Sequence, residues 1–98
     1  MKLFVLSPEA EGDLDGIRDY LLTEGGIRIA RYVLREIREG IRFVSRNPGA
    51  GHSRADLTDA PVKFWPVFSY LIVYDPLVKP LWVVRVLHGR RDVEGVLK

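Results

Sequence analysis

Between residues 27 and 44, apolar residues alternate by three and four positions, and this spacing constrains the fold more than any other feature. The residues are Ile27, Ala30, Leu34, Ile37, Ile41 and Val44. Side chains at this spacing share one face of an α-helix, and that face has to be buried. Asn47-Pro48-Gly49 ends the pattern, because proline cannot continue a helix and restricts the residue before it.

A shorter helix of the same kind precedes it. Ser7-Pro8-Glu9 reads as an N-cap, a first-turn proline and an acidic first turn, after a β-prone run from Lys2 to Leu6. One apolar stripe then follows, made of Ala10, Leu14, Ile17 and Leu21. Residues 23–26, Thr-Glu-Gly-Gly, interrupt this stripe before the second helix begins. Two helices joined by so short a link are expected to form an antiparallel hairpin.

From Pro61 onward the pattern changes to that of β-strands, at residues 62–65, 70–74 and 81–87. Proline cannot donate to a β-ladder, so Pro66 marks the first of these as an edge strand or as one with a bulge. The sequence therefore predicts one α+β domain over residues 1–98, with element order β-α-α-β-β-β. It has two layers, in which the helical hairpin packs on a small, mainly antiparallel sheet.

The composition excludes several classes of site. The 98 residues contain no cysteine, which excludes disulfides, thiolate metal sites and a cysteine nucleophile and favours a cytoplasmic protein. No run approaches the roughly 20 apolar residues that a membrane-spanning helix needs, so no membrane role is expected. With only His52 and His88 as imidazoles, and no glycine-rich phosphate loop, neither a metal nor another cofactor is predicted.

Charge is divided between the two predicted helices. The first carries mostly acids, whereas the second carries six arginines, namely Arg28, Arg31, Arg35, Arg38, Arg42 and Arg46. Three interpretations are open. The two helices could pair acid with base, the arginines could bind an acidic segment of a partner, or they could bind nucleic-acid phosphate.

The last strand contains a cation in an apolar run. Arg85 lies inside Leu81-Trp-Val-Val-Arg-Val-Leu-His88, and burying a cation without a partner is costly. Arg85 is therefore expected to pair with a carboxylate, Asp75 or Asp92, or to face a solvated groove. Alternatively, a basic set could bind and cleave a phosphodiester without a metal, with a histidine as proton donor or acceptor. That set consists of Arg54, Lys63, Arg85 and His88.

The order and spacing of several short motifs resemble the RelE/ParE superfamily of toxins, and the ParE branch in particular. They are Leu6-Ser-Pro-Glu-Ala10, Asn47-Pro48 with Gly51, Arg54-Ala-Asp-Leu57, Tyr70-Leu-Ile-Val-Tyr74 and Arg85-Val-Leu-His-Gly-Arg-Arg-Asp92. The resemblance covers nearly the whole chain. It implies a RelE-like fold and the toxin of a type II toxin–antitoxin system, a plasmid-stabilisation toxin, whose acidic antitoxin segment folds on binding.

The resemblance also implies a choice of target. ParE-like members poison DNA gyrase by binding, whereas RelE-like members cut mRNA on the ribosome. RelE-type nucleases tend to have a tyrosine shortly after the last strand, where this chain has Glu94, and an acid is a poor substitute for a stacking phenol beside RNA. The glutamate favours the gyrase branch, whereas Lys63, which stands where an arginine is expected, does not discriminate between the branches. Gyrase is therefore the predicted target, with a metal-independent, ribosome-dependent endoribonuclease and a non-toxic structural or regulatory module as alternatives.

The resemblance assigns residues to two binding surfaces. The segment after the last strand is expected to contact the target, through Gly89, Arg90, Arg91 and Asp92. An apolar surface beside the hairpin, flanked by arginines, is expected to take the antitoxin. Its residues are Leu14, Ile17, Arg31, Leu34, Arg35, Arg38 and Ile41.

Overall fold

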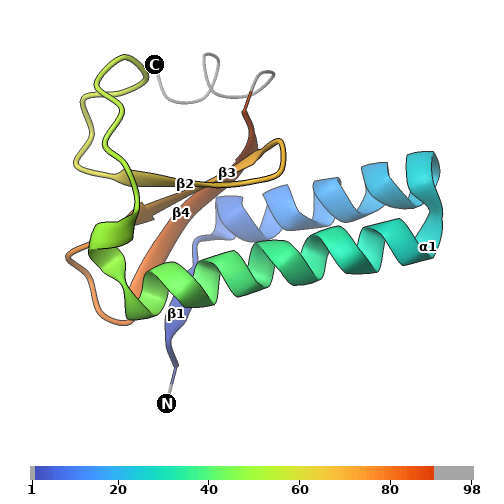
Figure 1. Ribbon diagram of the computed structural model, residues 1–98, viewed down its shortest axis with the longest axis horizontal. Coiled ribbons are helices and arrows are strands. Elements are labelled where there is room, and N and C mark those ends of the chain that lie inside the picture. The colour runs from blue at the N-terminus through green and yellow to red at the C-terminus, as the bar shows by residue number, and fades with distance from the viewer. Residues whose placement is uncertain (1, 90–98) are drawn as a thin grey trace.

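Four strands form one mixed sheet, and a bent helix packs against one of its faces (Figure 1). The computed structural model describes residues 2–89. The strands are β1 (Phe4–Leu6), β2 (Lys63–Val67), β3 (Tyr70–Asp75) and β4 (Leu81–His88), in the spatial order β1-β4-β3-β2. β1 pairs with β4 in parallel, and the other two pairings are antiparallel, so the predicted two-layer α+β arrangement is confirmed.

The helical layer is a single element, α1 (Pro8–Arg46), that folds back on itself at Gly26. Gly26 has φ 80° and ψ 178°, which a residue with a side chain rarely adopts. The two arms, residues 8–25 and 27–46, run antiparallel in Figure 1, as a hairpin should. The sequence predicted an interruption over residues 23–26, but the helix breaks at one residue only. Among residues 2–89, no helix combines the length and the apolar character needed to cross a membrane.

Both ends of α1 follow from local chemistry. The hydroxyl of Ser7 accepts a hydrogen bond from the Ala10 N–H at 2.9 Å, and Pro8 occupies the first turn, as the sequence predicted. At the other end, the Asn47 N–H still bonds to the Phe43 carbonyl, and the short 3-10 turn η1 (Pro48–Ala50) follows. The proline at position 48 thus ends the helix where the sequence placed its end.

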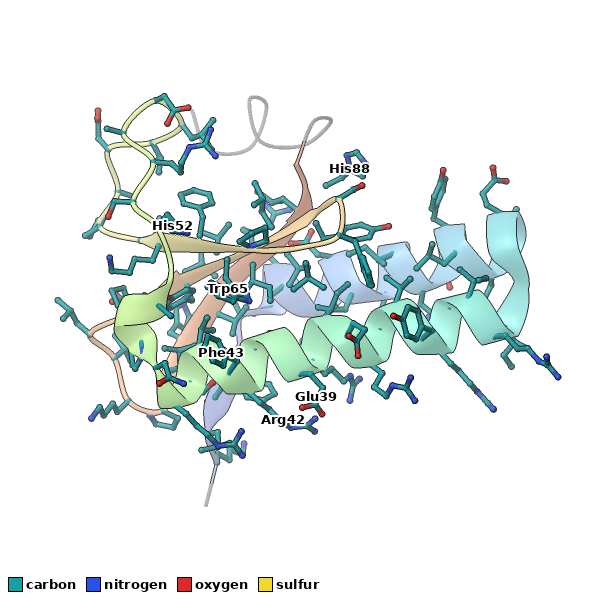
Figure 2. All side chains as sticks on the ribbon, in the orientation of Figure 1. Glu39, Arg42, Phe43, His52, Trp65 and His88 are labelled. Carbon is teal, nitrogen blue, oxygen red and sulfur yellow. The ribbon has the colours of Figure 1, made fainter. Side chains whose placement is uncertain are left out.

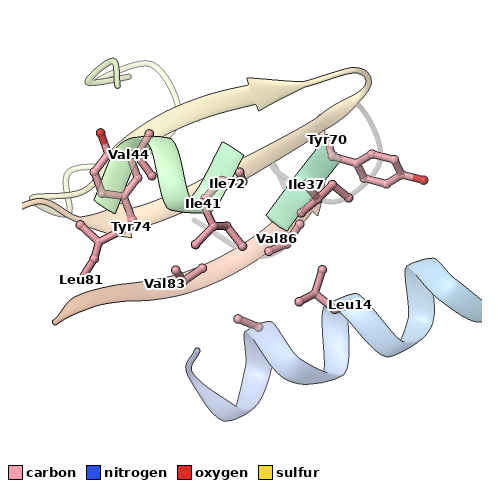
Figure 3. Close-up of a cluster of buried hydrophobic side chains, with 11 residues drawn as sticks. Leu14, Ile37, Ile41, Val44, Tyr70, Ile72, Tyr74, Leu81, Val83 and Val86 are labelled. Carbon is pink, nitrogen blue, oxygen red and sulfur yellow. The ribbon is translucent and has the colours of Figure 1, made fainter. Parts of the chain in front are cut away.

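The main core fills the space between the two arms of α1 and the sheet (Figure 3). Both predicted apolar stripes contribute to it, through residues such as Leu14, Ile37 and Ile41, which meet Ile72 and Val83 from the strands. Ile27 departs from the prediction and is exposed, because the bend of the hairpin extends beyond the sheet (Figure 1).

The outer edge of β2 is closed to further strand pairing. His52 exchanges two backbone hydrogen bonds with Phe64, at 2.8 and 2.7 Å. Along an edge strand, the backbone N–H and C=O groups of every second residue point away from the sheet. After Phe64 the next such residue is Pro66, which has no N–H. The prediction that Pro66 lies on an edge strand is confirmed.

Tyr74 connects the end of α1 to the sheet. Its hydroxyl donates to the Pro48 carbonyl at 2.7 Å and accepts from the Gly51 N–H at 2.9 Å. A Cβ on residue 51 would overlap this hydroxyl, so glycine is needed there for close approach. Burial raises the pKa of the Tyr74 phenol, although the hydrogen bond from Gly51 opposes the shift.

Candidate functional site

The first arm of α1 covers the outer edge of β4 where β1 ends. β1 pairs with β4 only as far as Val83. Ser7 continues the cover, because its N–H donates to the Val83 carbonyl at 2.9 Å and its hydroxyl donates to the Val84 carbonyl at 2.6 Å. Asp13 then accepts a hydrogen bond from the Val86 N–H at 3.0 Å. Side chains of the helix thus replace a neighbouring strand along this edge.

The same Asp13 carboxylate holds Arg85. The guanidinium donates through Nε and Nη2 to the two carboxylate oxygens, each at 2.7 Å, which is the bidentate geometry of a strong ion pair. The side chains are only 24% and 15% exposed. Arg85 therefore has the expected carboxylate partner, which is Asp13. The prediction that Asp75 is this partner is wrong. Asp75 instead accepts from the Leu77 N–H in the turn after β3, and Asp92 lies outside the described residues.

The four residues of the basic set do not form one site. Arg54 and Lys63 line the same hollow of about 440 Å³ beside the loop before β2. Lys63 pairs with Tyr74 near one end of β3, and His88 pairs with Tyr70 at the other end. At the usual rise of a strand, Tyr70 and Tyr74 are about 13 Å apart. The His88 ring contacts Tyr70 edge-on, with centroids 5.7 Å apart.

Arg54 has a carboxylate of its own. Its Nε and Nη2 donate to Asp56 at 3.0 and 2.8 Å in an exposed loop. This hydrogen bonding lowers the pKa of the Asp56 carboxyl and raises the pKa of the guanidinium. Arg54 and Arg85 therefore each form an ion pair, with Asp56 and Asp13 respectively, in different parts of the fold.

The arginines of the second arm lie on the solvent side of the hairpin. Arg28, Arg31, Arg35 and Arg38 are exposed, and Arg42 bonds Glu39 within its own arm at 2.7 Å. In the first arm, Arg18 pairs with its neighbours Asp15 and Asp19. No ion pair between the two arms occurs in residues 2–89. The interpretation that the helices pair acid with base is therefore wrong.

The apolar residues predicted to receive the antitoxin are only partly available. Leu14 and Ile41 are buried in the core, so the prediction that they form exposed surface is wrong. Ile17 and Leu34 are half-buried against the same core. The physical reason is that the sheet already covers the apolar stripe of each arm. The exposed residues of the predicted set are the arginines Arg31, Arg35 and Arg38.

Exposed aromatic residues beside the second arm were missed at the sequence level. Tyr32 lies 5.8 Å from Phe68, and Phe43 lies 5.0 Å from Trp65, measured between ring centroids. Figure 2 shows Phe43 next to Trp65. A signal was present, because Tyr32 and Phe43 are about three helical turns apart and so share a face outside the buried stripe.

The predicted target-binding segment is described only at its beginning. The Gly89 N–H donates to the Ser69 carbonyl at 2.8 Å and so continues the pairing of β4 with the β3 side. Arg90, Arg91 and Asp92, like Glu94, lie outside the described residues. Within residues 2–89, no three His, Asp or Glu side chains come close enough together to hold a metal ion.

Comparison with known proteins identifies the family of this chain. Residues 4–93 match the family model described as the ParE toxin of the type II toxin–antitoxin system parDE. The chain belongs to this ParE toxin family.

A solved structure shares the ParE fold. It is titled "Chromosomal ParDE TA system from P. aeruginosa" and matches with a TM-score of 0.72. The match covers 90% of this chain and 96% of that chain, at 20% sequence identity. At that identity the likeness concerns the fold alone. No curated protein matches this ParE chain at a significant level.

Proposed function

We propose that this ParE-family chain is a cytoplasmic toxin that inhibits DNA gyrase by binding it, and that a cognate antitoxin neutralises it. The pairing of Arg85 with Asp13 is the observation that carries the choice of binding over catalysis. A metal-independent nuclease needs cations directed at the phosphodiester, where negative charge develops in the transition state. Arg85 is instead neutralised in a bidentate pair.

The carboxylate adds a second obstacle to cleavage. A phosphodiester next to Arg85 would also be next to Asp13, which repels it, because like charges in a partly desolvated site destabilise each other. His88 also lies toward the far end of β3 from Lys63, so the general acid–base candidate and one of the candidate cations are separated. These features support a toxin that acts through its surface.

Gyrase and the antitoxin would bind to two different surfaces. The segment from Gly89 to Asp92, which directly follows β4 in the sequence, would contact gyrase. The exposed arginines Arg31, Arg35 and Arg38 would attract an acidic antitoxin segment that orders on binding. Because the two sets of residues belong to different parts of the chain, substitutions in one set should affect one activity at a time.

The test is to run two assays on one preparation of the chain. Supercoiling by purified gyrase should be inhibited, and mRNA in a ribosome-dependent assay should stay intact. Replacing both Arg90 and Arg91 with alanine should abolish the inhibition and leave antitoxin binding unchanged. RNA cleavage that disappears with His88→Ala would instead establish a RelE-like nuclease. A chain with neither activity, and without growth arrest on expression, would be a non-toxic module.

A further inference from the structure

The turn between β2 and β3 has an unusual backbone. Within residues 2–89, Phe68 is the only residue other than glycine with a positive φ, at 55°. It is the first residue of a two-residue turn, since Val67 pairs directly with Tyr70. Turns of this length prefer glycine or asparagine where φ is positive, and a bulky side chain there is an outlier. The residue at position 68 thus contradicts the local preference of its own turn.

Packing within the fold does not account for this phenylalanine. Its ring contacts Tyr32, with centroids 5.8 Å apart, yet Phe68 remains 59% exposed and Tyr32 47% exposed. A contact between two half-exposed rings stabilises a protein less than a strained backbone conformation of this kind costs. Strain that packing does not offset is typical of functional positions, where a side chain is held in place for a partner.

A hollow of about 240 Å³ lies beside the turn. Pro66, Phe68 and Leu71 give it apolar walls. Tyr70 and His88 line it as well, in edge-on ring contact with centroids 5.7 Å apart, and Figure 2 shows His88 near the turn. A hollow of this size has room for one large side chain. The Phe68 ring therefore borders a site that a single apolar side chain of a partner can enter.

The proposed target-binding segment begins at this hollow. Gly89, the first residue of that segment, also lines the hollow. Its N–H donates to the Ser69 carbonyl at 2.8 Å, which ties the end of β4 to the turn. The turn and the start of the segment are therefore parts of one continuous surface, and a partner that contacts Gly89 also meets Phe68.

We propose that Phe68 anchors the interface with gyrase, and that the hollow beside it receives an apolar side chain of gyrase. This rests on the proposed function and adds the β2–β3 turn to the target-binding surface. Exposed aromatic side chains are typical anchors of protein–protein interfaces, because they bury a large area at a small entropic cost. The short turn holds Phe68 in one backbone conformation, so little ordering is needed when gyrase binds.

The first test is Phe68→Asn, which removes the ring and places a residue that tolerates the positive φ. The concentration of the chain that halves supercoiling by purified gyrase should rise at least about tenfold. The midpoint of thermal unfolding should not fall, because the backbone strain is relieved. A phenylalanine that only supported the fold would lower stability and inhibition together. Phe68→Tyr keeps an aromatic ring in the same turn and should inhibit like the parent chain.

A second variant tests the hollow and leaves Phe68 in place. Ser69→Glu keeps the backbone bond to Gly89 but adds a charge where Ser69 lines the hollow. Inhibition should again weaken at least about tenfold, because burying an unpaired charge in an interface is costly. Leu77→Asn is the matched control, since Leu77 is 86% exposed in the turn at the other end of β3. It should inhibit gyrase like the parent chain.

The outcomes separate the two proposals. If the parent chain inhibits gyrase and Phe68→Asn and Ser69→Glu inhibit equally well, the turn is not part of the interface, and the proposed function stands. If Phe68→Asn weakens binding of the antitoxin but leaves inhibition of gyrase unchanged, the turn contacts the antitoxin instead, and the anchor proposal is wrong. If the parent chain does not inhibit gyrase, both proposals fail.

Discussion

Asp13 stabilises the last strand in two ways, by neutralising Arg85 and by accepting the Val86 N–H. These contacts join residues about seventy positions apart and lie where β4 has lost its neighbour β1. A cation in an apolar strand is tolerated here because its partner is supplied by the other layer of the fold.

Asp13→Asn should lower the free energy of unfolding by about 2 kcal/mol, because Arg85 loses its counter-charge in a partly buried place. Urea denaturation would measure this. Asp15→Asn is the control, since Asp15 is exposed in its pair with Arg18 and its loss should cost less than about 0.5 kcal/mol. Equal effects of the two substitutions would contradict the role given to Asp13.

Tyr74→Phe should cost about 1–2 kcal/mol, because the Gly51 N–H and the Pro48 carbonyl both lose their partner. The pKa of Tyr74 is raised above its ordinary value of 10.0, so the folded state holds the phenolic proton more tightly than the unfolded state. Its contribution is therefore complete below pH 10 and declines as the pH rises above 10. Alkaline unfolding of the parent chain should show this decline, whereas Tyr74→Phe should lack this component.

At the scale of elements, α1 reverses its direction at a single residue, Gly26. Gly12 and Gly16 are in regular helix, whereas Gly26 alone has a positive φ. The two-arm hairpin therefore depends on Gly26, while the other two glycines only weaken the first arm.

Gly26→Ala and Gly16→Ala should change stability in opposite directions. An added Cβ meets nothing within 4 Å at either position, so only the backbone conformation differs. Alanine at 26 should cost about 1–3 kcal/mol because of the positive φ with extended ψ, whereas alanine at 16 should gain up to about 1 kcal/mol. Thermal unfolding would measure both. A gain at position 26 would show that the reversal does not need glycine.

At the scale of the whole molecule, the arginines of the second arm share one face of the hairpin and, within residues 2–89, form no ion pair with the first arm. Exposed charges of this kind mainly raise association rates and favour partners of opposite charge, and salt weakens them. The arginines therefore suit recognition of an acidic segment.

Arg35→Glu combined with Arg38→Glu should weaken antitoxin binding at least about tenfold and make it less sensitive to salt. Calorimetric titration at several salt concentrations would measure both effects. The control, Arg54→Glu combined with Lys63→Glu, makes the same charge change beside the hollow before β2. Similar losses in both double variants would mean that net charge, and not this face, governs binding.

The sequence by itself determined the elements, and their boundaries to within a few residues. The N-cap at Ser7, the stop at Pro48, the apolar stripes and the edge position of Pro66 all follow from interactions between near neighbours in the chain, which a single sequence records. Only the tertiary structure decided which apolar residues of the helix stay exposed, because the sheet covers Leu14 and Ile41 and leaves Tyr32 and Phe43 open. It also decided the partner of Arg85, since the meeting of Asp13 with the uncovered edge of β4 depends on strand order and helix placement.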